Sequence, residues 1–121
     1  AKLEKVKNAV VHCFGGTADE AKKFMSLGLY IGITGIVTFK NAKELQAMVR
    51  DIIPLEKILI ETDSPYLAPE PHRGKQNKPQ YVGFVAKKIA EIKGRTYNEV
   101  SEETSRNAID LYKIKKYEET N

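Results

Sequence analysis

Residues 29–61, which read LYIGITGIVTFKNAKELQAMVRDIIPLEKILIE, decide the fold class of this chain of 121 residues. The apolar runs 29–34 and 57–61 each predict a buried strand. Between them, apolar side chains recur at the spacing of an amphipathic helix, at Leu45, Met48, Val49 and Ile52. Pro54 then closes that helix. The order strand, helix, strand predicts parallel pairing through a right-handed crossover.

The flanking sequence repeats the same alternation. Residues 9–14, AVVHCF, read as another buried strand, and the amphipathic helix that follows ends at Gly28. A further helix begins at Pro79 and ends at Gly94, and a last helical region reaches Tyr112. Apolar strands alternating with amphipathic helices predict an α/β fold with a parallel sheet covered by helices.

Three helix starts carry the spacing of a capping box, in which a small polar residue is followed three positions later by Glu. The pairs are Thr17 with Glu20, Asn41 with Glu44, and Thr96 with Glu99. Each pair predicts where a helix begins.

Length and composition set limits but name no function. The chain has the size of a single domain or a fragment of one, and we expect its tail, 113–121, to fray. Its 41% hydrophobic and 30% charged residues are typical of an ordinary globular protein, and the formal charge of +4 favours polyanionic partners only mildly.

Cysteine content and hydropathy indicate the compartment. The single cysteine excludes a disulfide within the chain, and no apolar run approaches the roughly 18–20 residues that span a bilayer. No secretory signal precedes the first strand, so we expect a cytoplasmic protein without a membrane partner. The chain begins with Ala, and an upstream segment can therefore be missing.

Candidate chemistry lies where the strands end, because parallel α/β proteins bind ligands at the carboxyl ends of their strands. His12 and Asp63 occupy such positions, and imidazole and carboxylate are common ligands of divalent hydrolytic metals. On spacing alone, a core histidine bonded to backbone is the more common interpretation of His12. Asp63, just before Ser64-Pro65, could equally form an Asx turn. Two residues alone do not make a metal site.

The long loop 62–79 holds four of the five prolines, and long irregular loops in compact domains are usually functional. Its polar residues would suit a phosphate-bearing substrate: His72, Arg73, Lys75, Asn77 and Lys78. Solvated loop charge is the alternative interpretation.

Two neighbouring features receive weaker interpretations. Gly15-Gly16 before a helix could let a phosphate approach the helix N-terminus, although a tight strand-to-helix turn is the simpler alternative. Cys13 is expected to be buried and inert. A thiol nucleophile needs a base, and the side chain of the adjacent His12 would point to the opposite face of the strand.

Five strings, taken in order and spacing, resemble the TatD family of magnesium-dependent deoxyribonucleases. They are HCF at 12–14, YIGITG at 30–35, TFKNA at 38–42, ETDSPYLAP at 61–69 and HRGK at 72–75. The resemblance covers about residues 9–112. The string ETDSPYLAP is the most specific of the five.

The resemblance implies a TIM-like barrel of metal-dependent hydrolase type. His12 is similar to the metal ligand on the sixth strand, and Asp63 to the ligand on the eighth strand that also serves as general base. The family's His-x-His pair on the first strand, its Glu and its remaining His have no counterpart here. A complete barrel needs about 250 residues, so this chain has room for only the C-terminal strand-helix units, a partial barrel.

Two positions depart from the family pattern. The family usually has Ser where Gly15 stands and Glu where Lys78 stands. The first change keeps a small residue in the turn. The second reverses a charge near the expected substrate loop, which removes any contact that the Glu makes or raises the affinity for phosphate.

We therefore expect part of a metal-dependent phosphodiester hydrolase that acts on DNA with Mg²⁺, or with Mn²⁺ or Zn²⁺. Arg73, Lys75 and Asn77 are the expected substrate contacts. The isolated chain should be inactive without the missing N-terminal barrel segment, because one His and one Asp hold a metal weakly.

The sequence leaves two other functions to consider. One is a non-catalytic α/β module that binds a partner chain or a polyanion through open sheet edges and the basic loop. The other, a flavodoxin-like nucleotide binder, is disfavoured because the sequence has no convincing phosphate loop.

Overall fold

The computed structural model describes residues 9–62 and 68–120, with backbone alone for residue 79 and for 112–120. The strands are β1 (Val10–Val11), β2 (Tyr30–Ile33) and β3 (Ile58–Ile60). The α-helices are α1 (Ala18–Ser26), α2 (Lys43–Asp51), α3 (Val82–Lys93) and α4 (Tyr97–Thr120). Short 3₁₀ turns lie at η1 (Gly35–Thr38), η2 (Leu55–Lys57) and η3 (Pro79–Tyr81). The predicted alternation of strands and helices is confirmed.

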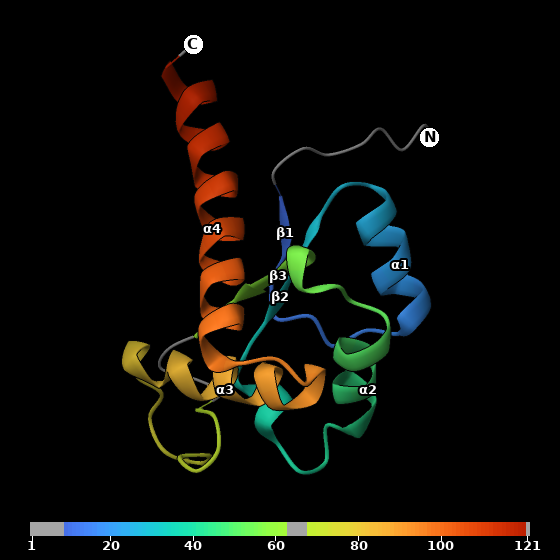
Figure 1. Ribbon diagram of the computed structural model, residues 1–121, viewed down its shortest axis with the longest axis vertical. Helices are drawn as coiled ribbons and strands as arrows, with labels where there is room; N and C mark the ends of the chain where they lie inside the picture. The colour runs from blue at the N-terminus through green and yellow to red at the C-terminus, as the bar shows by residue number, and fades with distance from the viewer. Residues whose placement is uncertain (1–8, 63–67, 121) are drawn as a thin grey trace.

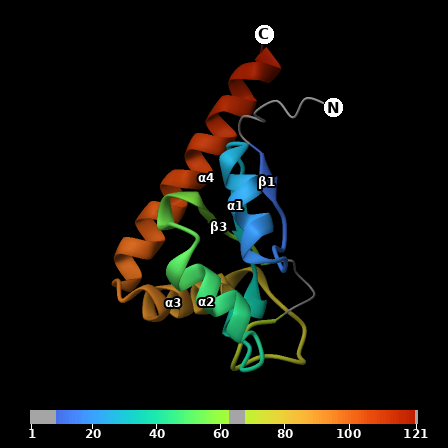
Figure 2. The same cartoon turned by 90° about the vertical axis from the view of Figure 1, so that its right-hand side faces the viewer.

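The three strands form one parallel sheet in the order β1-β2-β3. Helix α1 connects β1 to β2, and α2 connects β2 to β3, as the crossovers of a parallel sheet require. In Figure 1 the long α4 lies along one flank of the strands, and α1 and α2 lie along the other. The turned view in Figure 2 shows α1 beside β1, with α2 and α3 at the end of the molecule away from both termini.

The core lies between the sheet and the helices. Ile31 and Ile33 of β2 and Ile58 of β3 are completely buried in one cluster. The helices contribute the buried side chains Ala21, Val49, Val85, Ile89 and Val100 to the same cluster. Each large aliphatic side chain buried in this way contributes about 1.5–3 kcal/mol relative to an exposed one.

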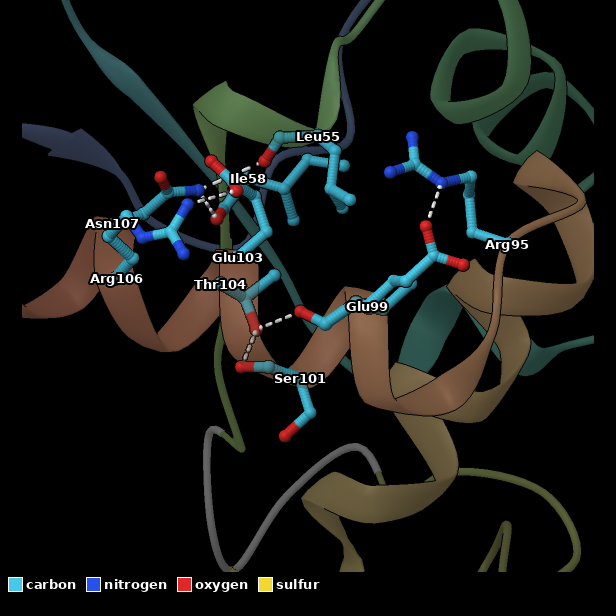
Figure 3. Close-up of polar contacts among 10 residues, drawn as sticks. Leu55, Ile58, Arg95, Glu99, Ser101, Glu103, Thr104, Arg106 and Asn107 are labelled. Carbon is cyan, nitrogen blue, oxygen red and sulfur yellow. Dashed lines mark hydrogen bonds and ion pairs between the residues drawn. The ribbon is translucent and has the colours of Figure 1, made fainter.

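One polar side chain ties α4 to the start of β3. The amide Nδ2 of Asn107 donates to the carbonyl of Leu55 at 2.9 Å and to that of Ile58 at 2.8 Å (Figure 3). Asn107 is only 4% exposed, so water cannot replace these bonds. This pair of bonds therefore fixes the axial position of α4 against the sheet.

Two of the three predicted capping boxes are confirmed. Thr17 caps α1 with both reciprocal bonds to Glu20, and the Thr96 and Glu99 pair makes the same two bonds before α4. The prediction for Asn41 was wrong. Helix α2 starts one position later, with Ala42 as its N-cap, and the Oδ1 atom of Asn41 accepts a bond from Arg73 instead.

Three of the predicted helix ends agree with the structure, and that of the last helix does not. Gly28 and Gly94 follow α1 and α3 with φ of 88° and 64°, a left-handed conformation that favours glycine. Helix α2 ends at Asp51, shortly before Pro54. Helix α4 continues to Thr120, beyond the predicted end at Tyr112, and the fraying of 113–121 stays a prediction.

The first strand is shorter than predicted. Its ladder covers only Val10–Val11 instead of residues 9–14. Cys13 adopts a left-handed φ of 48°, which turns the chain out of the extended conformation. Phe14 then returns to the sheet, where its N–H donates to the carbonyl of Gly32 at 2.9 Å.

Candidate functional site

The strand register determines which side chains lie on the same face of the sheet. Val11 pairs with Ile31, and Gly32 pairs with Leu59. Because neighbouring residues of a strand point to opposite faces, Gly32 lies on the face opposite to the buried Ile31. Glu61, two residues after Leu59, falls on the same face as Gly32. This face of the sheet carries the candidate site at the carboxyl ends of the strands.

His12 and Glu61 are joined across this face. His12 Nδ1 lies 2.5 Å from Glu61 Oε1, a short hydrogen bond to a carboxylate. The His12 side chain is 77% exposed, whereas the Glu61 side chain is 18% exposed. His12 is therefore not a core histidine. Its exposed imidazole can offer the other ring nitrogen, Nε2, to a metal.

Cys13 holds the second oxygen of the same carboxylate. Its backbone N–H donates to Glu61 Oε2 at 2.9 Å. Its Sγ lies 3.7 Å from Thr34 Oγ1. The prediction of a buried strand residue was wrong for Cys13, which is partly buried and sits in the turn after β1.

Gly32 forms the floor beneath the Glu61 carboxylate. A Cβ atom at this position would lie 2.5–2.6 Å from the carboxylate carbon and both its oxygens. Real Cβ atoms do not approach other atoms so closely, so the carboxylate could not stay in place above any larger residue. The φ of Gly32 is not in the left-handed region. The position of the Glu61 carboxylate, and not the backbone conformation, therefore requires glycine here.

Glu61 is the site residue that sequence reasoning missed. It was interpreted only as the end of a strand and as part of the string ETDSPYLAP. A usable signal was present, because Glu61 ends a buried strand at the same sheet edge as His12. The same reasoning selected Asp63, two positions farther along, instead of Glu61.

Asp63 lies outside the described residues, so its predicted approach to His12 stays a prediction. Within 9–62 and 68–120, no group of three or more His, Cys, Asp or Glu side chains is arranged to hold a metal. In the same ranges, no helix is both long and apolar enough to cross a membrane.

The basic loop places Arg73 against the segment that follows η1. Its guanidinium carbon lies 3.8 Å from the centroid of the Phe39 ring, and Nη1 donates to Asn41 Oδ1 at 3.4 Å. Stacking on an aromatic ring restricts the long side chain while Arg73 remains exposed. An exposed and restrained guanidinium is suited to bind an anion.

The other predicted loop residues differ in placement. Lys75 is exposed, and its backbone N–H donates to the carbonyl of His72. Asn77 is 3% exposed, and its amide donates to the carbonyl of Thr62. This placement favours a role for Asn77 in holding the backbone next to Asp63 over direct contact with a substrate.

His72 packs inside the loop. Its ring stacks on Tyr81 with centroids 4.2 Å apart and meets the edge of Phe84. These contacts anchor the loop to the start of α3. Of the two histidines, only His12 therefore lies at the strand ends with an exposed ring.

The glycine pair before α1 forms a turn. Glu20 places a carboxylate oxygen 3.1 Å from the N–H of Thr17, and a Cβ at Gly16 would lie 3.0 Å from that oxygen. An acidic side chain already satisfies the helix N-terminus. This favours the turn interpretation over a phosphate site.

The chain matches a known family over most of its length. The model of the TatD related DNase family matches residues 1–113. The chain is 46% identical over 105 residues to the uncharacterized metal-dependent hydrolase YabD of Bacillus subtilis, covering 87% of this chain and 41% of that protein. It is 47% identical over 105 residues to the uncharacterized metal-dependent hydrolase YcfH of Escherichia coli, covering 87% and 39%.

Solved structures show the same fold. The TatD homolog YJJV from Escherichia coli superimposes with a TM-score of 0.78 at 28% identity, covering 85% of this chain and 39% of that one. A TatD family hydrolase from Entamoeba histolytica gives 0.71 at 26% identity, covering 84% and 41%. The chain thus spans about two fifths of the length of the relatives it matches.

Proposed function

Because the chain belongs to the TatD related DNase family of metal-dependent hydrolases, we propose that it supplies the C-terminal strand-helix units of a barrel that hydrolyses phosphodiester bonds in DNA. The relatives' names support metal-dependent hydrolysis. DNA as the substrate is our inference from the family and from the basic loop. The remaining strands of the barrel would pair with β1 and β3, which are the two edges of the described sheet.

The hydrogen bond between His12 and Glu61 carries this proposal. A histidine that binds a metal almost always donates its other ring N–H to a carboxylate, a carbonyl or water. His12 meets this criterion through Nδ1, at a strand end where metal-dependent barrels place their ligands. The donor chemistry thus fits a divalent ion, although further ligands must come from outside the described residues.

We assign Asp63 as a second ligand and as the general base. A carboxylate at this position would accept the proton of the attacking water, a role typical of Asp and Glu. A bound divalent ion would lower the pKa of that water and neutralise charge on the phosphate. Mg²⁺ is the expected ion, with Mn²⁺ or Zn²⁺ as alternatives.

The substrate phosphates would bind along the basic loop. Arg73 is held against Phe39 and Asn41, so little of its side-chain entropy remains to be lost on binding. Lys75, exposed two residues later, adds a second cation. Together they would position the DNA backbone without reading its sequence.

The proposal is tested by removing each histidine in a barrel that joins this chain to the N-terminal units. We expect His12→Ala to weaken Mn²⁺ binding, measured by calorimetry, and to abolish most metal-dependent cleavage of DNA. The matched control, His72→Ala, removes a ring that packs on Tyr81 and should leave Mn²⁺ affinity unchanged. Equal Mn²⁺ affinity of the wild type and the His12→Ala variant would contradict the proposal.

The open sheet edges favour a second candidate function, a module that binds a partner chain. Both β1 and β3 pair with β2 alone among the described strands. With ladders of only two and three residues, these edges offer few backbone groups to a partner. A partner chain that completes the barrel would agree with both candidate functions, the hydrolase and the partner-binding module. A complex with an unrelated chain and no metal binding would favour the module.

A further inference from the structure

We propose that Glu61 is a positioning residue that fixes the ring orientation and the tautomer of His12, and that Gly32 provides the space in which Glu61 does so. The inference deepens the proposed function and rests on His12 being a metal ligand. Three contacts from two separate segments, residues 12–13 and Gly32, carry it.

The first two contacts each hold one oxygen of the carboxylate. Glu61 Oε1 meets His12 Nδ1 at 2.5 Å, and Oε2 accepts the backbone N–H of Cys13 at 2.9 Å. The second bond is donated by Cys13 in a left-handed conformation, with a φ of 48°, which is uncommon in a residue other than glycine. Two bonds at two oxygens leave the carboxylate little freedom to rotate.

Gly32 lies against the face of the carboxylate. The missing Cβ would lie 2.5 Å from the carboxylate carbon, so the Glu61 carboxylate rests directly on the β2 backbone. The space under the carboxylate therefore exists only because residue 32 has no side chain.

The consequence for His12 is a defined tautomer. A neutral imidazole has one N–H donor and one acceptor nitrogen, and a carboxylate can only accept. With Nδ1 facing Glu61, the proton resides on Nδ1 and the lone pair on Nε2. Nε2 is then presented for coordination before any metal arrives. A free ring would rotate and populate both tautomers. Its apparent affinity for the metal would then be reduced to the fraction of rings in the competent tautomer.

The variant that isolates this role is Gly32→Ala, which leaves both Glu61 and His12 in the chain. The added methyl group collides with the end of a flexible side chain, so Glu61 can swing aside and the fold is retained. Glu61→Ala removes the carboxylate directly. Gly15→Ala is the matched control, because a Cβ at Gly15 meets nothing within 4 Å.

The tautomer is read by long-range nitrogen–proton NMR correlation on the metal-free chain in alkaline buffer. The chain contains two histidines, so two sets of ring signals arise, and His72 serves as the internal reference. We expect a pure Nδ1–H tautomer for His12 in the wild type and in Gly15→Ala. Mixed tautomers are expected in Gly32→Ala and in Glu61→Ala. The double variant should match Glu61→Ala, because Gly32→Ala acts only through Glu61.

Titration with Mn²⁺, followed by broadening of the His12 ring signals, gives the functional readout. We expect Gly32→Ala and Glu61→Ala to require about 10–100 times more Mn²⁺ than the wild type, the usual effect of losing the carboxylate partner of a ligand histidine. A purely structural role would lower thermal stability without changing the tautomer.

Two results would overturn the inference. One is a mixed His12 tautomer in the wild type. The other is an unchanged tautomer in Gly32→Ala together with weaker Mn²⁺ binding, which would make Glu61 itself a ligand. If the tautomer responds as expected and Mn²⁺ never broadens the His12 signals, the hydrogen-bond geometry stands and the proposed metal function fails.

Discussion

Asn107 offers a sharp test of how α4 is held to the sheet. The Asn107→Leu variant keeps the branched heavy-atom shape of the side chain but removes the amide that donates to Leu55 and Ile58 (Figure 3). Each lost hydrogen bond costs about 1 kcal/mol, and a buried carbonyl that loses a partner adds part of a desolvation penalty of ~1–3 kcal/mol. The Leu55 carbonyl keeps the bond from the N–H of Ile58, which limits the second cost.

We therefore expect the free energy of unfolding to fall by about 2–3 kcal/mol. For a chain of this length the corresponding loss in Tm is on the order of 8–12 °C. The measurement is urea and thermal unfolding followed by circular dichroism.

Thr104→Val provides the matched control on the same helix. Thr104 is almost as buried as Asn107, at 6% against 4% exposed. Its hydroxyl donates to the carbonyl of Val100 within α4, a bond that links no other element. Replacing it by an isosteric residue should change stability by less than about 0.5 kcal/mol. If the two variants lost the same stability, the Asn107 bonds would not be what holds α4 in place.

Three further predictions concern charge and helix capping. The pKa of Glu99 is lowered from its ordinary value of 4.5, first by the backbone N–H of Thr96, so the stability that Glu99 contributes is present above pH 4.5 and is lost as pH falls through the folded pKa. Glu99→Gln should flatten the dependence of the urea midpoint on pH in that acid range, and an unchanged profile would refute this. Charge removal at Arg73 or Lys75 in a complete barrel should weaken DNA binding similarly across sequences and reduce the salt slope by about 0.7–0.9 per lost phosphate contact. Thr17→Ala should lower the free energy of unfolding by about 1 kcal/mol in denaturant titrations, and a neutral effect would show that the capping box is not stabilising.

The fold class could be predicted from the sequence because each local signal acts at short range. The apolar runs around Ile31 and Ile58 mark strands that are buried on helix-covered sheet faces. The left-handed glycines Gly28 and Gly94 mark helix ends for a steric reason that does not depend on the rest of the fold.

The errors arose where tertiary contacts override local patterns. Asn41 has the spacing of a cap, but Arg73, distant in sequence, donates to its side chain. Cys13 belongs to an apolar run that predicts a strand. Its N–H instead donates to the Glu61 carboxylate, and its left-handed φ ends the extended conformation. In both cases a long-range hydrogen bond decided the local conformation.

The candidate site was predicted in part. His12 was selected because it ends a strand, and the structure places it at the strand ends with an exposed ring. The role of Glu61 could not be predicted, because it depends on the register that sets Glu61 above Gly32 and beside His12. Sequence spacing identifies strand ends, but it does not give the register between neighbouring strands.

We propose that this chain contributes catalytic chemistry to a metal-dependent phosphodiesterase. The most direct test is the rate of Mg²⁺-dependent or Mn²⁺-dependent DNA hydrolysis by a barrel that includes this chain, compared with its Asp63→Asn variant. Asn keeps the volume of the side chain but removes the charge and the proton acceptor. The rate should therefore fall by on the order of 10²-fold or more while DNA binding survives. The isolated chain should show no appreciable turnover. Full activity of the Asp63→Asn barrel would contradict the account.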